Sequence, residues 1–406
     1  MRNPRPRTHS PRRVATASLL TAALAVGATG CGKHADPTAL PGDFTNNGEG
    51  SLVSANVLPN VATDITDNSS LAARYTYVST SGVNNHPLNV SGTLLLPRGV
   101  SSSEGWKIVA VAHPMTGIQR GCAPSSSNDL FGLVPTVVPL LQAGYAVTVP
   151  DYQGLGTAVE RHPFLDSTTV GRNLIDSVRA AAKFAHTSNS WVAIGTGQGG
   201  QASWAANELM SEDGAGLELK ASLSVEPWAN LEGLADAAAA GTLTTEQKLV
   251  LVQYLAGLKA QFDEFDLDQY RRGGAAKDWD ALLTCDTAQR KNNLIDQVSA
   301  DDLRPATPAA TDALRNYLRK TTLPQGKAAA PIRVSYTDSD PIALAAWTSQ
   351  ALTKACRFDD TIEIDHDSQP NPANVDMPTV VKWIDDRMNN VPPANDCPGL
   401  AAAEPQ

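Results

Sequence analysis

The chain has 406 residues, a hydrophobic content of 42% and a formal net charge of -10 at pH 7, with a pI near 5.2. A chain of this length can bury the core of one large α/β domain with an insertion, or the cores of two domains. Because no basic block follows the N-terminus, the acidic balance argues against nucleic acid as a partner.

The N-terminus has the pattern of an export signal. A basic stretch precedes a short apolar stretch, which is too short for a transmembrane helix, and small residues lead to Cys31. The sequence "ATGC" that ends at this cysteine resembles a lipobox, although ordinary cleavage after "ATG" is the alternative. The pair Arg12-Arg13 is compatible with twin-arginine export. We expect residues 1–31 to be a signal peptide with a lipobox cysteine and residues 32–50 to be a flexible tether.

Cysteine usage supports this expectation. Five cysteines leave one over in an exported protein. If Cys31 is lipidated, an even set remains: Cys122, Cys285, Cys356 and Cys397. Four cysteines allow three pairings, and an oxidising compartment favours disulfides. We therefore expect a cell-surface lipoprotein that reaches the membrane only through its lipid anchor, or else a secreted protein.

Beyond residue 50, strand and helix patterns alternate along the chain. Two antiparallel strands are predicted at residues 73–82 and 87–97. Near-continuous apolar runs at residues 106–114 and 145–152 are typical of buried parallel strands. Further strands are predicted at residues 191–195, 220–227, 331–338 and 361–367, and helices at residues 133–144, 170–187, 199–210 and 378–388. This alternation predicts an α/β fold, with a mostly parallel central sheet and helices on both faces.

The strand pattern is interrupted by a long helical segment. Residues 228–330 are rich in Ala, Leu, Lys and Asp, and include "TEQKLVLVQYLAGLKAQF". An all-helical insertion between two core strands is the usual form of a cap or lid. We expect residues 51–227 and 331–397 to form the core and residues 228–330 to form a helical cap.

The stretch "GTGQGG" follows the predicted strand at residues 191–195 and precedes a helix. The nucleophile-elbow pattern G-x-S-x-G is met at Gly195 and Gly199, but its central position is Gly197. Glycine has no side chain to attack an ester, although it adopts the positive φ of an elbow without strain. We expect the side chain of Thr196 to point away from the site. Ser203 lies well into the helix, so neither residue replaces the nucleophile.

Several ordered motifs resemble the secretory lipase family, the lipase-A-like α/β hydrolases. They are "AHPMTG", "CAPS", "DYQGLGT", "HPFLD", the elbow "GTGQGG", "YTDSDP", His366 and "WIDDRM" before Cys397. The resemblance implies an α/β-hydrolase fold with an inserted cap, and hydrolysis of triacylglycerols or other carboxylic esters. It also implies the disulfides Cys122–Cys285 and Cys356–Cys397.

The resemblance also implies the catalytic acid and base. Asp338 and Asp340 both follow a late strand, and the family pattern favours Asp340. His366 is the expected base, because it follows the last strand and precedes Trp383 by the family's spacing. The alternatives are that both aspartates are loop residues and that the histidine is an exposed loop residue. His113 and His162 belong to other family motifs, "AHPMTG" and "HPFLD", and are expected to be structural.

The oxyanion hole needs two backbone donors. One is expected to be the N–H of Gln198, directly after the vacant position. The other is expected from Met115 or Thr116, because Pro114 has no N–H to donate.

The sequence leaves two functions open. The first is a lipase-fold protein without efficient hydrolysis, which binds an acyl or ester-like ligand or a partner. The second is an active lipase or esterase that uses Asp340 and His366 with an activated water or an unforeseen nucleophile. A serine-to-glycine change introduced into the sequence is a further explanation. No cofactor is expected: the histidines are scattered, the cysteine spacings are unlike zinc motifs, and "GTGQGG" follows a mid-chain strand, unlike a dinucleotide-binding loop.

Overall fold

The computed structural model describes residues 38–157, 161–285, 288–367 and 376–403. The expected signal peptide, Cys31 and the first part of the expected tether lie outside these described residues. Within them, no helix is long and apolar enough to cross a membrane.

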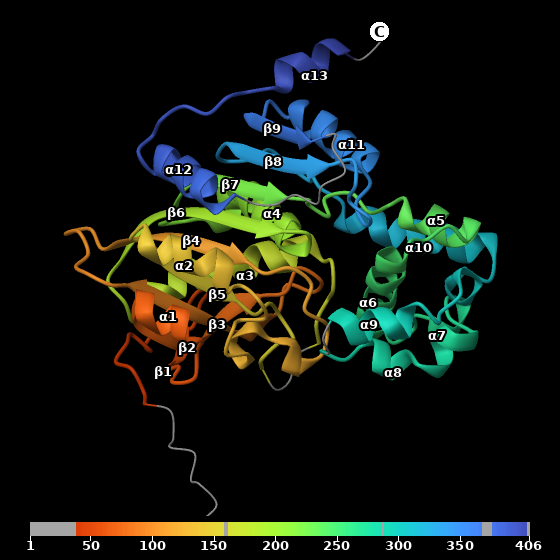
Figure 1. Ribbon diagram of the computed structural model, residues 1–406, viewed down its shortest axis with the longest axis horizontal. Coiled ribbons are helices and arrows are strands. Elements are labelled where there is room, and N and C mark those ends of the chain that lie inside the picture. The colour runs from red at the N-terminus through yellow and green to blue at the C-terminus, as the bar shows by residue number, and fades with distance from the viewer. Residues whose placement is uncertain (1–37, 158–160, 286–287, 368–375, 404–406) are drawn as a thin grey trace, which may run out of the picture. The chain divides into compact units, whose positions relative to one another are not determined.

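A central sheet of nine described strands organises the core, in the order β1-β2-β3-β5-β4-β6-β7-β8-β9 (Figure 1). The strands are β1 (Leu52–Val57), β2 (Ser69–Thr80), β3 (Pro87–Pro97), β4 (Trp106–Ala112), β5 (Ala146–Pro150), β6 (Thr187–Thr196), β7 (Glu218–Val225), β8 (Ile332–Thr337) and β9 (Ile362–Asp367). Strands β1, β2 and β3 pair antiparallel, as does β3 with β5, whereas the strands from β5 through β4, β6, β7 and β8 to β9 run parallel to one another. The predicted antiparallel pair and the predicted parallel strands are confirmed.

The apolar runs form the middle of the sheet because these strands are covered on both faces. Val109, Val147 and Val192 lie side by side on β4, β5 and β6, and all three are fully buried. Helices α2 (Val134–Gln142) and α12 (Met377–Met388) pack on the face of the sheet that carries these three valines.

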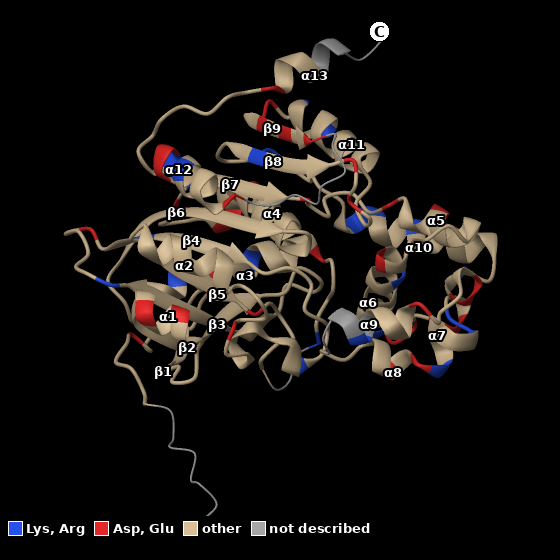
Figure 2. Ribbon diagram, in the orientation of Figure 1, with Lys and Arg blue, Asp and Glu red and all other residues tan. Residues whose placement is uncertain are grey.

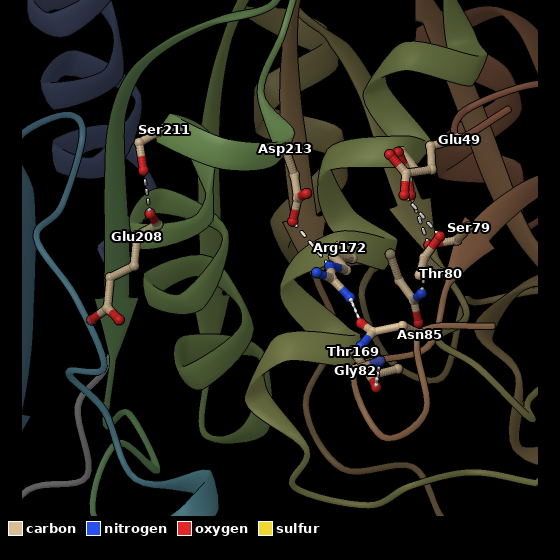
Figure 3. A network of polar contacts seen from close by, with 12 residues as sticks. Glu49, Ser79, Thr80, Gly82, Asn85, Thr169, Arg172, Glu208, Ser211 and Asp213 are labelled. Carbon is tan, nitrogen blue, oxygen red and sulfur yellow. Dashed lines mark hydrogen bonds and ion pairs between the residues drawn. The ribbon is translucent and has the colours of Figure 1, made fainter. Parts of the chain in front are cut away.

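The opposite face is covered by α3 (Ser167–Ala181), α4 (Gln198–Asp213) and α11 (Ala345–Cys356). Polar contacts at the edge of this layer join α3 to its surroundings. Arg172 of α3 donates to Asp213 at 3.0 Å and to Asn85 at 2.9 Å (Figure 3). The short helices α1 (Thr63–Asn68) and α13 (Cys397–Ala403) complete the core.

The described residues between β7 and β8 contain helices and no strand. They are α5 (Leu234–Ala240), α6 (Thr245–Gln261), α7 (Gly273–Lys277), α8 (Trp279–Leu282), α9 (Ala288–Ile295) and α10 (Pro308–Thr321). Thr244 begins α6 with a capping box that includes Gln247. Charges of both signs are spread over these helices (Figure 2), and the ion pair between Arg315 and Asp236 joins α10 to α5.

Two disulfides join segments that are distant in the sequence. Cys122–Cys285 links a loop of the core to the helical insertion, and Cys356–Cys397 links the end of α11 to α13. These are the two pairs that the resemblance implies.

Candidate active site

The turn between β6 and α4 has the geometry of a nucleophile elbow. β6 ends at Thr196, α4 begins at Gln198, and Gly197 between them has φ 60° and ψ -116°. The N–H of Gly197 donates to the carbonyl oxygen of Val225 at 2.9 Å, and its carbonyl oxygen accepts from Gln201 at 3.0 Å. A residue with a side chain would be strained in this conformation, which glycine adopts freely.

The elbow is tight because two flanking glycines allow the backbone to approach closely. A Cβ on Gly195 would lie 2.2 Å from the carbonyl oxygen of Gly199. A Cβ on Gly199 would lie 2.0 Å from the carbonyl oxygen of Ala112, at the end of β4. In the sheet, β4 lies between β5 on one side and β6 on the other. The strand order therefore reverses at β4, beside the elbow that follows β6. In open α/β sheets this is where ligands bind.

The neighbouring hydroxyl groups do not take the place of the nucleophile. The Ser203 hydroxyl is buried between α4 and the sheet, 2.9 Å from the Ser224 hydroxyl and 3.1 Å from the carbonyl oxygen of Leu223. Thr196 is exposed. It lines a separate cavity of about 240 Å³, together with Pro114 and Met377.

The carboxylate that contacts His366 is Asp338, and not the favoured Asp340. Nε2 of His366 lies 2.8 Å from Oδ1 of Asp338. The reason is strand register: His366 lies opposite Tyr336 on β8. Asp338, two residues beyond Tyr336, therefore projects from the same face.

Asp340 has different partners. Its Oδ1 accepts from the N–H of Ile342 at 2.8 Å. Burial, together with the nearby charge of Glu226, raises the pKa of Asp340 to about 7. Glu226, directly after β7, has a φ of 43° and accepts a hydrogen bond from the Thr337 hydroxyl at 2.9 Å. In the structure Asp338, and not Asp340, contacts His366, and the assignment of the catalytic acid stays a prediction.

His366 lies within β9, inside the strand predicted at residues 361–367, and β9 pairs with β8. Its role as the base stays a prediction. In the sheet, β9 lies three strands from β6. The residues that follow β9, 368–375, lie outside the described residues.

The expected oxyanion donors lie at the same edge of the sheet as the elbow. Gln198 is the first residue of α4, and Ala112, which pairs with Gly195, leads into the loop that carries Met115 and Thr116. Met115 packs against the core of the helical insertion, and Thr116 is buried. Their role as donors stays a prediction.

Two buried histidines next to the elbow have structural contacts. Nδ1 of His113 lies 2.7 Å from the carbonyl oxygen of Pro114, and Nδ1 of His162 lies 2.8 Å from that of Gln153. Burial lowers the pKa of His162 to about 4, so its ring is neutral at pH 7. Both rings stack on the ring of Tyr152. The centroid distance is 4.0 Å for His113 and 6.3 Å for His162.

The "CAPS" and "DYQGLGT" motifs meet in the core. Asp151 is fully buried and accepts hydrogen bonds from the backbone N–H of Ser125 at 2.8 Å and from the Ser91 hydroxyl at 2.5 Å. A buried carboxylate with several donors is satisfied, which gives these motifs a structural role.

Trp228 is a site residue that sequence reasoning missed. It follows β7 in "EPW", and its indole contacts the position that a side chain at 197 would occupy: a Cβ on Gly197 would lie 3.3 Å from Cε2 of Trp228. The available signal was an aromatic residue just beyond a parallel strand that neighbours the elbow strand.

A larger cavity lies between the core and the helical insertion. Its volume is about 370 Å³, and Phe164, Tyr254, Leu258, Phe262 and Tyr317 are in its lining. Lys320 and Asp166 add polar groups. In the described parts of the chain, no group of three or more His, Cys, Asp or Glu residues can hold a metal ion.

The sheet order, the elbow and the helical insertion define an α/β-hydrolase fold. Residues 134–396, more than half of the chain, match the Secretory lipase family, and the chain belongs to that family. A search of curated proteins found no match. Family membership and the two disulfides are consistent with an exported protein.

Solved structures confirm the expected fold class. Candida antarctica lipase A in its closed state superposes with a TM-score of 0.70 at 14% identity, over 87% of this chain and 86% of the lipase. A ligand-bound form of the rice cell wall degrading esterase LipA from Xanthomonas oryzae superposes with a TM-score of 0.69 at 19% identity, over 85% of this chain and 100% of the esterase.

Proposed function

We propose that this chain is an exported lipase-fold protein without efficient ester hydrolysis, which binds an acyl or ester-like ligand. The observation that carries the proposal is Gly197, a residue without a side chain at the apex of an elbow with φ 60° and ψ -116°. Removing the nucleophile of a serine hydrolase costs about 10⁶ in kcat.

The contacts of His366 are consistent with the proposal. Its imidazole contacts Asp338 and stacks on Tyr336 within the β8–β9 pair. We expect these contacts to hold the ring at the strand pair, so that a water in the space of an absent serine side chain would lack a base.

The cavity of about 370 Å³ is the site that we propose for the apolar part of the ligand. Ligand sites in proteins are mostly apolar, with a few polar groups, and have volumes of about 300–1,000 Å³. Aromatic and aliphatic side chains of α6 and α10 supply the apolar lining, and Lys320 at the same cavity provides a cation for a carboxylate or another electron-rich head group.

Hydrolysis is tested with the purified protein and p-nitrophenyl butyrate. Working enzymes typically turn over at about 1–10³ s⁻¹. We expect a kcat below about 10⁻³ s⁻¹, because only binding and backbone donors remain. A kcat of about 1 s⁻¹ or more would refute the loss of hydrolysis.

Ligand binding is tested separately with a fluorescent acyl probe, 11-(dansylamino)undecanoic acid. The variant Leu258→Trp fills part of the cavity, and we expect it to weaken binding at least about tenfold. Leu344→Trp is the matched control, because Leu344 is exposed. Equal binding by both variants would place the probe elsewhere.

The second candidate function is hydrolysis by His366 with an activated water. The contact between His366 and Asp338 favours it, since a carboxylate–histidine pair can accept a proton from water. This mechanism requires that His366→Ala abolish whatever hydrolysis the wild-type protein shows. Activity that survives this substitution would exclude it.

We also propose that Cys31 carries a lipid anchor after export. The pairing of the other four cysteines supports this, because it leaves Cys31 as the remaining one of five. In a host that lipidates such signals, Cys31→Ser should abolish incorporation of radiolabelled palmitate and release the protein from the membrane fraction. Unlabelled wild-type protein would contradict the anchor.

A further inference from the structure

Trp228 lies directly against the apex of the elbow. Three atoms of its indole, Cε2, Nε1 and Cζ2, lie 3.3, 3.4 and 3.5 Å from the place of a Cβ on Gly197. The closest of these distances is tighter than an ordinary van der Waals contact, and a serine hydroxyl would add an atom beyond that Cβ. The space beside Gly197 is therefore already occupied by protein.

The indole is held on two sides. The backbone N–H of Trp228 donates to the carbonyl oxygen of Gly197 at 3.2 Å. Its ring meets Phe164 edge-on, with centroids 6.3 Å apart and an interplanar angle of 65°. Trp228 is only 5% exposed and belongs to the apolar core of the helical insertion. Moving it would open a cavity in that core, which is unfavourable.

Phe164 extends this arrangement toward the ligand cavity. Phe164 lines the cavity of about 370 Å³, and its ring also meets the ring of Trp228. The contacts therefore run from the cavity through Phe164 and Trp228 to Gly197.

We propose that Trp228 closes the elbow, so that a ligand in the cavity has no access to Gly197. The inference rests on the proposed function, in which position 197 is a vacant nucleophile position. It adds a second, independent barrier: restoring a nucleophile side chain at 197 is not sufficient for ester attack while Trp228 stays in place.

Access to position 197 is measured by thiol labelling. Gly197→Cys is made in a chain with Cys31→Ser, where the other cysteines are paired in disulfides, and the folded protein is treated with iodoacetamide. Thr196→Cys is the matched control, because Thr196 is the adjacent residue and is exposed. A thiol that reacts only when the structure opens is labelled slowly.

We expect Gly197→Cys to be labelled at least about 30-fold more slowly than Thr196→Cys, because a buried thiol waits for an opening event. Adding Trp228→Ala should raise the rate at 197 at least about tenfold and leave the rate at 196 unchanged. Equal rates at 196 and 197 with Trp228 in place would overturn the closure. The labelling does not depend on hydrolysis, so this result would leave the proposed loss of hydrolysis standing.

A second measurement applies if a cysteine at the positive φ of position 197 prevents folding. Trp228→Gly leaves Gly197 unchanged and empties the space above it. Indole that fills this space should raise the Tm of the variant in a concentration-dependent manner and leave the wild-type Tm unchanged. A Tm of the variant that does not respond to indole would overturn the closure.

Discussion

Tyr336 and His366 lie opposite each other on β8 and β9, with their rings stacked 4.4 Å apart at an interplanar angle of 7°. Together with the contact between Nε2 of His366 and Asp338, this stacking fixes the imidazole at the strand pair. Under the proposed function, a vacant apex and a base held at the strand pair would be two separate reasons for inefficient hydrolysis.

Gly197→Ala should destabilise the protein for two separable reasons. A non-glycine residue at this φ costs about 1–3 kcal/mol, and the added Cβ also presses on Trp228. Gly216→Ala is the matched control, because Gly216 has a φ of 81° and nothing within 4 Å of its Cβ position. Urea unfolding should show a larger loss at 197 than at 216.

A double-mutant cycle separates the contact from the strain. In a Trp228→Ala background, Gly197→Ala should cost less than in the wild type, because only backbone strain remains. An unchanged cost in that background would show that Trp228 does not press on this position.

Asp340→Asn should change the pH dependence of stability. Burial, with the charge of Glu226, raises the pKa of Asp340 to about 7, above its value of 3.8 in an unfolded chain. The folded protein therefore binds the proton more tightly, and stability is lost as the pH rises from about 4 through 7. Asparagine keeps the acceptor for Ile342 and cannot ionise.

The variant should gain stability relative to wild type as the pH rises, by about 2–4 kcal/mol between pH 4 and pH 8. Chemical denaturation across this range measures the difference. If the free energy of unfolding differs between variant and wild type by the same amount at pH 4 and pH 8, the pKa of Asp340 is not raised in the folded protein.

The two disulfides should contribute unequally to stability. Cys122–Cys285 spans 163 residues and Cys356–Cys397 spans 41. In the chain-entropy account, the disulfide that closes the longer loop adds about 1 kcal/mol more to the free energy of unfolding. Replacing both cysteines of a pair by serine should therefore cost more for Cys122–Cys285, as measured by guanidinium unfolding. Equal costs would show that local contacts, and not loop length, dominate.

Much of the fold follows from patterns within single segments. The apolar runs of β4 and β5 and the glycines around Gly197 predict buried strands and a tight turn, because both depend on local residue types. Family motifs supplied the disulfide pairs Cys122–Cys285 and Cys356–Cys397, which spacing alone left open.

The contacts around the candidate site follow less directly from the sequence, because they join distant segments. The choice between Asp338 and Asp340 is set by the register of β8 against β9, and one residue of shift changes which side chain faces His366. The position of Trp228 depends on how the helical insertion leaves β7, which no local pattern specifies.

The central claim, that the elbow has no nucleophile, is tested most directly by intact-mass spectrometry after treatment with a fluorophosphonate. This reagent forms a stable phosphonyl adduct with an activated serine or threonine. We predict that the wild-type protein keeps its mass, since Gly197 offers no atom to phosphonylate and Ser203 is buried between α4 and the sheet. Stoichiometric addition of one phosphonyl group to the folded protein, lost in His366→Ala, would reveal a working nucleophile and contradict the account.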